Sequence, residues 1–392
     1  MQPNVLSVSV GVKIWPGGFI MRRAPAIHVL MIDGATLEQT TLRPTAGSAR
    51  KWLKVLAPYR APDAMRSIFE LAVTIIPFAA LWACAWFALT FSYWLAIPFM
   101  VAAAGFLVRI FLIQHDCGHG AFFSKRPTND WVGRCLGVLT FTPFADWKHA
   151  HAMHHASSGN LDHRGFGDID TLTVREYEAL SPWRKLRYRI YRNPFIMLGV
   201  GPAYVFVLRN RLPTGYFKAG GWAWISAMGT NVAILAIGLG LMWFIGWQAF
   251  LAIQLPVVVM AATIGVWLFY VQHQFEDTVW EVPPDWDRHD AALYGSSHYD
   301  LPGWLRWMTA NIGVHHVHHL SSVIPYYRLQ EILKDHPQLA EVKRMTLRDS
   351  LSCLRLRLWD ESQKRLVSFG EARQLVLERA HEAVQGAQNK AA

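Results

Sequence analysis

Charged residues are scarce in this chain, and their scarcity limits the classes of protein to which it can belong. Asp, Glu, Lys and Arg make up 17% of its 392 residues, against roughly 25% in soluble domains. Hydrophobic residues make up 52%, with 18 Trp and 21 Phe. The composition predicts an integral membrane protein rather than the two or three soluble domains that this length would suggest. The net charge of +10 requires no nucleic-acid partner, and we expect none, because Lys and Arg accumulate on the cytoplasmic face of membrane proteins.

The sequence shows neither paired cysteines nor a secretory leader. Its four cysteines are Cys84, Cys117, Cys135 and Cys353. No two of them form a C-x-x-C pair, which argues against a disulfide framework and an iron–sulfur site and favours a reducing compartment. Residues 1–61 contain no long apolar run followed by a small-residue cleavage site, so we expect no signal peptide. Because Met31 would serve equally well as a start, a mis-called extension is one interpretation of residues 1–30, and we assign them no function.

Two long stretches almost without charge predict four transmembrane helices. Glu70 is the only formal charge in residues 67–108. As a helix this stretch would be about 63 Å long, enough for two crossings of a hydrocarbon core of roughly 30 Å, with a turn near residues 91–94. Residues 222–275 hold no formal charge and would span about 81 Å, again two crossings, with a turn near Gly246.

Histidine, by contrast, is concentrated in three short clusters. They are His115 and His119, then His151, His154 and His155, then His315, His316, His318 and His319. Residues three or four apart share a helix face, so the first histidine of each cluster can lie beside later ones. Imidazole is a ligand for iron, zinc and copper, and it is neutral at physiological pH. A structural zinc takes four ligands and a haem one or two, so eight or more imidazoles predict a site with two metal ions.

The distribution of Lys and Arg predicts on which side of the membrane each segment lies. The two turns between paired spans carry no Lys or Arg. The positive-inside rule therefore places both termini and all three histidine clusters in the cytoplasm. We expect the membrane to be a bacterial inner membrane. Residues 194–208 are apolar and contain Pro202, and basic and aromatic residues precede them. Since this segment is too short for a comfortable span, we predict an interfacial helix lying on anionic lipid.

These features predict an all-α integral membrane protein, with four transmembrane helices in two hairpins and a cytoplasmic helical cap that holds a histidine-rich di-metal site. The predicted parts are an N-terminal cytoplasmic segment (1–61), transmembrane hairpin 1 (62–113), a cytoplasmic loop with the first two clusters and the interfacial helix (114–221), transmembrane hairpin 2 (222–273), and the cap with the third cluster (274–392). Residues 326–392 alternate charged and apolar positions at helical spacing, which predicts that this part of the cap is soluble and helical.

The three clusters, H-x-x-x-H, H-x-x-H-H and H-x-x-H-H, resemble the histidine boxes of the membrane fatty acid desaturases. Segments outside the boxes carry the resemblance further, and they are residues 157–161, 271–276, 295–297, 311–313 and 320–322. With the flanking helical sequence it covers residues 61–359. Within the family the chain is most similar to bacterial and plastid-type acyl-lipid omega-6 (Δ12) desaturases. Acyl-CoA Δ9 enzymes usually have one more residue between the first-box histidines, and front-end desaturases usually have Gln where His315 stands.

The resemblance implies a di-iron centre with two Fe²⁺ ions and O₂ as co-substrate. The ligands it implies are His115, His119, His151, His154, His155, His315, His318 and His319, with His273 as a further ligand at the end of the fourth span. His316 departs from the pattern, and we expect it to point away from the ligand face and to lie just behind the ligands. At His149, His163 and His298 we expect surface or structural roles.

Carboxylates near the boxes are candidates to orient the ligands, because a metal-bound imidazole usually donates its other N–H to a carboxylate or carbonyl. The candidates are Asp116, Asp146, Asp168, Asp170, Glu276 and Asp277. Each of them could instead be a solvated surface group. A further hypothesis places Asn311 near the metal site through a water molecule.

The expected chemistry follows from the inertness of the substrate. A side-chain base cannot remove a proton from an unactivated methylene, so an oxidant formed from O₂ at a metal is needed. The resemblance implies that the enzyme introduces a cis double bond into an acyl chain of a membrane lipid, with two electrons from outside. Since the sequence has no His-Pro-Gly-Gly haem-binding stretch, we expect a separate donor of the ferredoxin or cytochrome b5 type, docked on the basic cytoplasmic face.

Other interpretations remain open at this point. One keeps the di-iron site but gives hydroxylation or a related reaction of the acyl chain, or desaturation at the omega-3 position. A more distant one is a non-enzymatic membrane protein that binds metal. Its ligands would be expected inside the spans, along a path, whereas these histidines are predicted almost entirely outside them.

Overall fold

Four long helices dominate the structure, a computed structural model that describes residues 48–165, 169–215, 217 and 220–391. The helices that are long and apolar enough to cross a membrane are α2 (Ala64–Leu89), α3 (Tyr93–His119), α9 (Gly221–Ile245) and α10 (Trp247–His273). They follow one another as two pairs, α2 with α3 and α9 with α10. The prediction of a mostly helical protein with four candidate membrane spans in two hairpins is confirmed.

Short connections join the helices of each pair. Three residues separate α2 from α3. The last of them, Ser92, caps α3, because its side chain accepts a hydrogen bond from the Trp94 backbone N–H. Gly246 separates α9 from α10 with φ +86°, a conformation that glycine adopts without steric cost. Helix α3 continues through the first histidine cluster and ends at Gly120, with φ +70°. His115 and His119 therefore lie in the last turns of a transmembrane helix.

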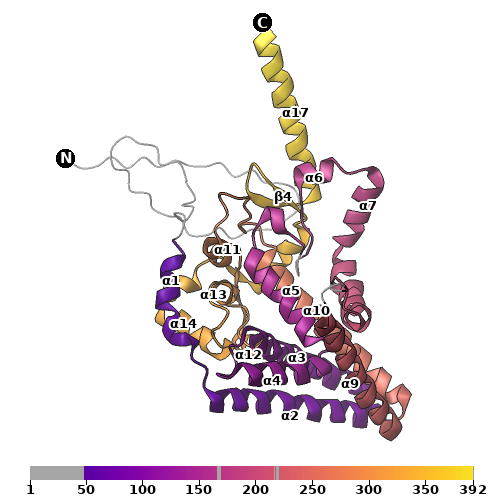
Figure 1. The fold of residues 1–392 in the computed structure, drawn as a ribbon. Coiled ribbons are helices and arrows are strands. Elements are labelled where there is room, and N and C mark those ends of the chain that lie inside the picture. Colours follow the sequence, from indigo (N-terminus) through magenta and orange to yellow (C-terminus); the bar gives the residue numbers. More distant parts are fainter. Residues whose placement is uncertain (1–47, 166–168, 216, 218–219, 392) are drawn as a thin grey trace, which may run out of the picture. The chain divides into compact units, whose positions relative to one another are not determined.

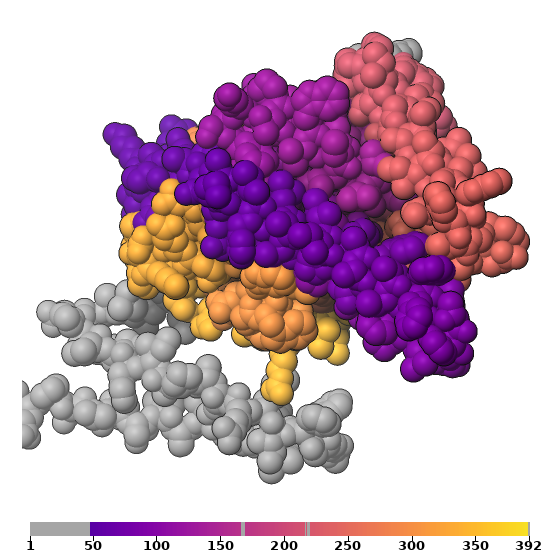
Figure 2. Space-filling view, turned by 90° about the horizontal axis from the view of Figure 1, so that it is seen from below, coloured from indigo at the N-terminus to yellow at the C-terminus, as the bar shows by residue number. Residues whose placement is uncertain are grey.

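Helix α3 is the best buried of the four. Over its most apolar stretch 56% of residues are buried, against 6% for α9. Helices α2 and α10 both pack against α3, and α9 packs against α10 (Figure 1). Seen from below, the indigo-to-purple surface of α2 and α3 lies between the magenta surface of α4 (Arg126–Leu139) and orange surface from the chain around residue 300 (Figure 2). The helix that carries the first cluster is thus held from several sides.

Shorter helical segments build the remainder, where α marks α-helices and η marks 3₁₀ or π turns. Besides α4, those before α9 are α1 (Arg50–Val55), η1 (Ala57–Arg60), α5 (Phe144–Ser157), η2 (Leu161–His163), α6 (Val174–Glu178), α7 (Pro182–Tyr191), η3 (Ile196–Val200), α8 (Gly201–Ala203), η4 (Tyr204–Leu208) and η5 (Arg209–Arg211). Those after α10 are α11 (Arg288–Tyr294), α12 (Gly303–Met308), α13 (His315–Leu320), η6 (Tyr326–Arg328), α14 (Leu329–Asp335), α15 (Pro337–Ala340), α16 (Leu347–Ser350), η7 (Leu351–Arg355) and α17 (Phe369–Ala391).

The segment predicted as an interfacial helix is helical in the structure. It runs through η3, α8 and η4, and it packs against α10, where the Thr263 hydroxyl donates to the Leu198 carbonyl at 2.7 Å. Phe195 and Leu208 expose large apolar side chains on it. The segment is not among the four candidate spans, and its position at the membrane surface stays a prediction.

Five short strands accompany the helices, and three of them lie within residues 326–392, which are otherwise mostly helical, as predicted. The strands are β1 (Leu172–Thr173), β2 (His298–Asp300), β3 (Arg344–Thr346), β4 (Leu358–Asp360) and β5 (Arg365–Val367). β4 pairs with β1 in parallel and with β5 antiparallel, while β2 and β3 form a parallel pair. The Asp360 carboxylate accepts backbone hydrogen bonds from Ser362 and Gln363 and so fixes the β4–β5 turn. Strands of three residues are too short for their periodicity to be read from sequence.

Candidate metal centre

Nine histidines converge in two groups, and they are the nine that the sequence predicted. The first group is His115, His119, His151, His155 and His318, and the second is His154, His273, His315 and His319. Within each group one nitrogen from every ring lies within 4.8 Å of the others. The structure thus brings residues from four distant parts of the chain to two adjacent points.

Each group draws on a different transmembrane helix. The end of α3 supplies two imidazoles to the first group, and the end of α10 supplies His273 to the second. Helices α5 and α13 supply imidazoles to both groups. Histidines four apart stay together, whereas histidines three apart separate: His151 joins His155 but not His154. A single cluster in the sequence therefore contributes to both histidine groups.

The nitrogen spacing fits metal coordination. In the first group, neighbouring Nε2 atoms lie 3.0 Å apart for His119–His151, 3.1 Å for His151–His155 and 3.2 Å for His155–His318. In the second they lie 2.9 Å apart for His273–His315, 3.2 Å for His154–His273 and 3.3 Å for His154–His319. Two nitrogens about 2.1 Å from one metal, at 90° or more, are separated by about 3 Å or more. Since a neutral imidazole carries only one N–H, several facing nitrogens are better satisfied by a shared cation.

Burial keeps these imidazoles ready to bind. It lowers the pKa of the histidines outside the spanning helices well below the ordinary value, and the neighbouring imidazoles lower it further. This holds for His151, His155, His315, His318 and His319. Their rings stay neutral at physiological pH, which is the form that a metal needs.

Among the candidate carboxylates, Asp116 is the one that lies against a ligand. One of its oxygens is 3.4 Å from His115 Nδ1, and the other accepts the Tyr326 backbone N–H at 2.7 Å. Glu276 is exposed and pairs with Arg365 at 3.0 Å. Asp170 and Asp277 are exposed, and Asp168 lies outside the described residues.

Asp146 has a different environment from the other candidates. Both of its carboxylate oxygens are buried and have no hydrogen-bond partner among the described residues. Burial raises the pKa of this carboxyl to about 6. Asp146 lies five residues before His151 on α5 and next to Trp147, whose ring stacks on His151 with centroids 4.8 Å apart.

Four further histidines considered in the sequence analysis, His149, His163, His298 and His316, lie outside both groups. His316 is fully buried outside both groups, and its Nε2 bonds with the Leu339 carbonyl at 2.8 Å. His298 is buried 5.6 Å from it, ring to ring, and its Nδ1 bonds with the Ala340 carbonyl. His149 and His163 are exposed. Asn311 donates to the Tyr326 carbonyl at 3.3 Å, and the hypothesis of a water link to metal stays untested.

A cavity of about 480 Å³ reaches both histidine groups. His115 and His151 of the first group line it, and so does His315 of the second. Most of its wall is apolar. One side is a stripe along α10, formed by Val258, Ala261, Ala262 and Gly265. Another part of the wall comes from the start of α5, with Pro143, Asp146, Trp147, Ala150 and His151. The geometry offers a long apolar molecule access to both histidine groups.

The comparison with known proteins agrees with this site. Residues 92–349 match the family model described as Fatty acid desaturase. The chain belongs to the fatty acid desaturase family. A fatty acid desaturase of Bacillus subtilis is 46% identical over 326 residues, covering 83% of this chain and 92% of the relative. The chain is therefore an oxidoreductase and a multi-pass membrane protein.

More distant desaturases with named products are also similar. An sn-1 oleoyl-lipid 12-desaturase of Anabaena variabilis is 26% identical, covering 62% of this chain and 70% of the relative. An sn-1 acyl-lipid omega-3 desaturase (ferredoxin) of Synechocystis is 29% identical, covering 60% of this chain and 66% of the relative. These relatives name two different positions of the double bond, so they do not decide between them for this desaturase.

Sequence reasoning missed two features around the centre. One is Trp147, stacked on His151. The other is a buried polar network that joins Glu70, Arg109 and Tyr326. The sequence did hold a signal for the network, because Glu70 is an isolated charge in an apolar span and Arg109 ends that span.

Proposed function

We propose that this desaturase uses O₂ and two external electrons to introduce a cis double bond into an acyl chain of a membrane lipid, at a di-iron centre. The observation that carries the proposal is the pair of imidazole groups at the wall of one apolar cavity. The nine histidines would hold two irons, five imidazoles at one and four at the other. Iron bound there would supply the oxidising chemistry needed to activate O₂ and to remove two hydrogens from adjacent methylenes.

The protein's own residues would bind the chain and exclude water. The small side chains of the α10 stripe leave room for methylenes, and Trp147 forms a flat wall beside His151. Burial of apolar chain surface against such a wall contributes about 25 cal/mol per Å². The position along the cavity at which the chain meets the histidines would select the carbons that react.

For the position of the double bond we propose Δ12, on an oleoyl chain. The support is the sequence resemblance to the omega-6 enzymes, together with relatives named oleoyl-lipid 12-desaturases. An omega-3 product is the second candidate, favoured by the relatives named omega-3 desaturases. For the donor we propose a ferredoxin, supported by a relative whose name includes one. For the membrane we propose the bacterial inner membrane, with the histidines and both termini on the cytoplasmic side, supported by the uncharged hairpin turns.

The test is the fatty acid profile of a host that makes this protein, compared with one that makes His154→Ala. Mass spectrometry of derivatised fatty acid esters locates each new double bond. A diene with its second bond at Δ12, absent from the variant, is the expected result. A bond at another position would overturn Δ12 and keep desaturation, and a hydroxylated chain would overturn the reaction itself.

A further inference from the structure

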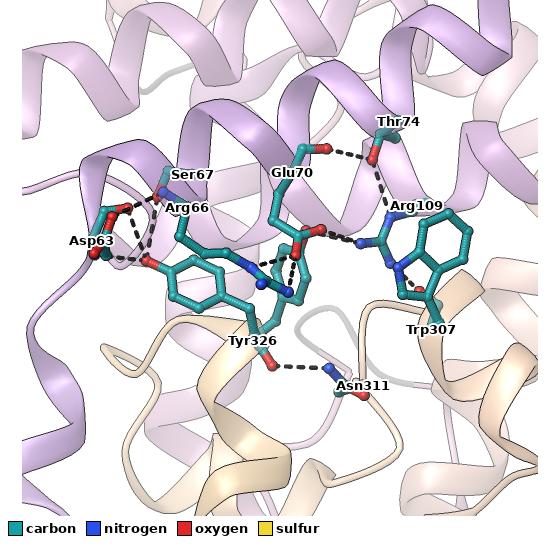
Figure 3. A network of polar contacts seen from close by, with 10 residues as sticks. Asp63, Arg66, Ser67, Glu70, Thr74, Arg109, Trp307, Asn311 and Tyr326 are labelled. Carbon is teal, nitrogen blue, oxygen red and sulfur yellow. Dashed lines mark hydrogen bonds and ion pairs between the residues drawn. The ribbon is translucent and has the colours of Figure 1, made fainter.

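A buried charge in the first hairpin lies in a polar network that extends to the metal centre. Glu70 is 1% exposed, and its ion pair with Arg109 joins α2 to α3 (Figure 3). The other oxygen of Glu70 accepts from Arg66 at 2.8 Å. Tyr326, from the segment after the third histidine cluster, donates its hydroxyl to Glu70 at 3.0 Å. Apolar residues of similar volume often stabilise a protein as well as a buried ion pair does, so stability alone gives little reason for this arrangement.

Tyr326 is held at three of its polar groups. Its hydroxyl lies between Glu70 and Arg109, and its carbonyl accepts from Asn311 at 3.3 Å. Its backbone N–H donates to Asp116 at 2.7 Å. Asp116 is 1% exposed, and its second oxygen is the one 3.4 Å from His115 Nδ1. A continuous set of contacts therefore runs from the carboxylate on α2 to a histidine of the first group.

Arg109 fixes the other side of the same junction. Its guanidinium lies over the Trp307 ring at 4.2 Å, donates to the Trp307 carbonyl, and donates to the Thr74 hydroxyl at 3.0 Å (Figure 3). These contacts attach α12, just before the third cluster, to both helices of the first hairpin. The segments on either side of α13 are thus tied to the helix that carries the first cluster.

We propose that Glu70 is a positioning residue of the metal centre: with Arg109 it holds Tyr326, and the Tyr326 backbone N–H holds Asp116 against His115. The inference rests on the proposed function, in which His115 is a metal ligand. A metal-bound imidazole usually donates its second N–H to a carboxylate or carbonyl, which sets the orientation of the ring and its strength as a ligand. His115 Nδ1 is buried without a hydrogen-bond partner among the described residues, and Asp116 lies 3.4 Å from it. The Glu70 network fixes the position of the carboxylate that lies nearest to this nitrogen.

The test is Co²⁺ titration of the metal-free, full-length protein in lipid nanodiscs, followed by visible absorption. Tyr326→Phe removes only the hydroxyl and keeps the ring that stacks on Phe122. We expect the variant to bind Co²⁺ at one of the two positions about 10-fold more weakly, the low end of the effect of such supporting contacts, with altered d–d bands. Glu70→Gln should produce a larger loss at the same position. If Glu70→Gln does not fold, Tyr326→Phe still decides the question.

Tyr327→Phe is the matched control. Tyr327 bonds Ser67 and the Asp63 backbone near the start of α2, and within the described residues no hydrogen bond joins it to Glu70 or Asp116. This change should not alter Co²⁺ affinity or bands. Wild-type affinity and bands in Tyr326→Phe, or an equal effect in Tyr327→Phe, would overturn the inference. A wild-type protein that takes up no Co²⁺ would instead overturn the proposed metal centre, and the inference with it.

Discussion

The two histidine groups of this desaturase differ in how they are built. The four-histidine group is buried throughout, whereas His119 and His151 of the five-histidine group are partly exposed. The four-histidine group depends on α10 for one imidazole, and the five-histidine group depends on α3 for two. At the five-histidine group the Asp116 carboxylate lies 3.4 Å from His115 Nδ1. The five-histidine group thus has one more imidazole, and the four-histidine group is the more deeply buried.

The comparison predicts that His273→Ala is more damaging than His119→Ala. The first change leaves three imidazoles in its group, and the second leaves four. We expect His273→Ala to reduce desaturation by more than about 100-fold, beyond the 10–100-fold typical of supporting residues, and the metal content to fall from two per chain towards one. Metal analysis of purified protein, with product yield, checks this. His149→Ala, an exposed change on α5, is the control, and equal losses in both ligand variants would refute the asymmetry.

The cavity reaches both groups, so filling it should affect product without affecting metal. At Gly265 an added Cβ would have open space within 4 Å, and the position lies on the α10 stripe of the cavity. We expect Gly265→Leu to reduce conversion of long acyl chains about 10-fold while metal content stays unchanged. The new side chain would displace a few CH₂ groups of the acyl chain, each of which contributes about 0.8 kcal/mol when buried. Gly240→Leu on α9 also has open space and should leave both unchanged. Loss of metal in Gly265→Leu would show that the helix had moved.

Asp146 should make the protein less stable as pH rises. Its folded pKa of about 6 lies above the ordinary 3.8, so the unfolded chain releases this proton first. The stability that the protonated Asp146 carboxyl contributes to the folded state is fully present below about pH 4 and is lost as pH rises through 6. Asp146→Asn should therefore raise the melting temperature at pH 7.5, by roughly 2–4 °C for each kcal/mol recovered, and the advantage should shrink at pH 5. A melting-temperature difference that does not depend on pH would contradict this origin.

The smallest effect is expected at Glu276, an exposed carboxylate that sequence proximity made a candidate. Its ion pair with Arg365 is at the surface, and such pairs contribute between about 0 and 1 kcal/mol. Glu276→Gln should leave metal content and product yield within experimental error of the wild type. The same change at Asp116, to Asn, should weaken metal binding, and an equal response at both positions would remove the distinction between them.

Much of the site could be predicted because histidine ligands can be recognised in a sequence from their residue type and spacing. Nine histidines at helical spacing, together with apolar stretches of known length, indicated both the four helices and the residues that meet. The carboxylates were different, because proximity in sequence says nothing about burial or direction. Of the five candidates that the structure describes, Asp116 is the one that lies against a ligand, while Asp146 is buried without a partner in the described part of the chain. The strands of the cap were missed because three residues carry too little pattern.

The sequence by itself determined that this chain crosses a membrane, roughly where its four long helices lie, and which imidazoles are available. These properties follow from local composition and spacing. Only the tertiary structure decided how the imidazoles divide, since His151 and His154 belong to one cluster but to different groups. It also decided that Glu70 acts as an internal ion-pair partner and contacts Tyr326, 256 positions away. Such pairings depend on which helix faces pack together, and that is a property of the whole fold rather than of any segment.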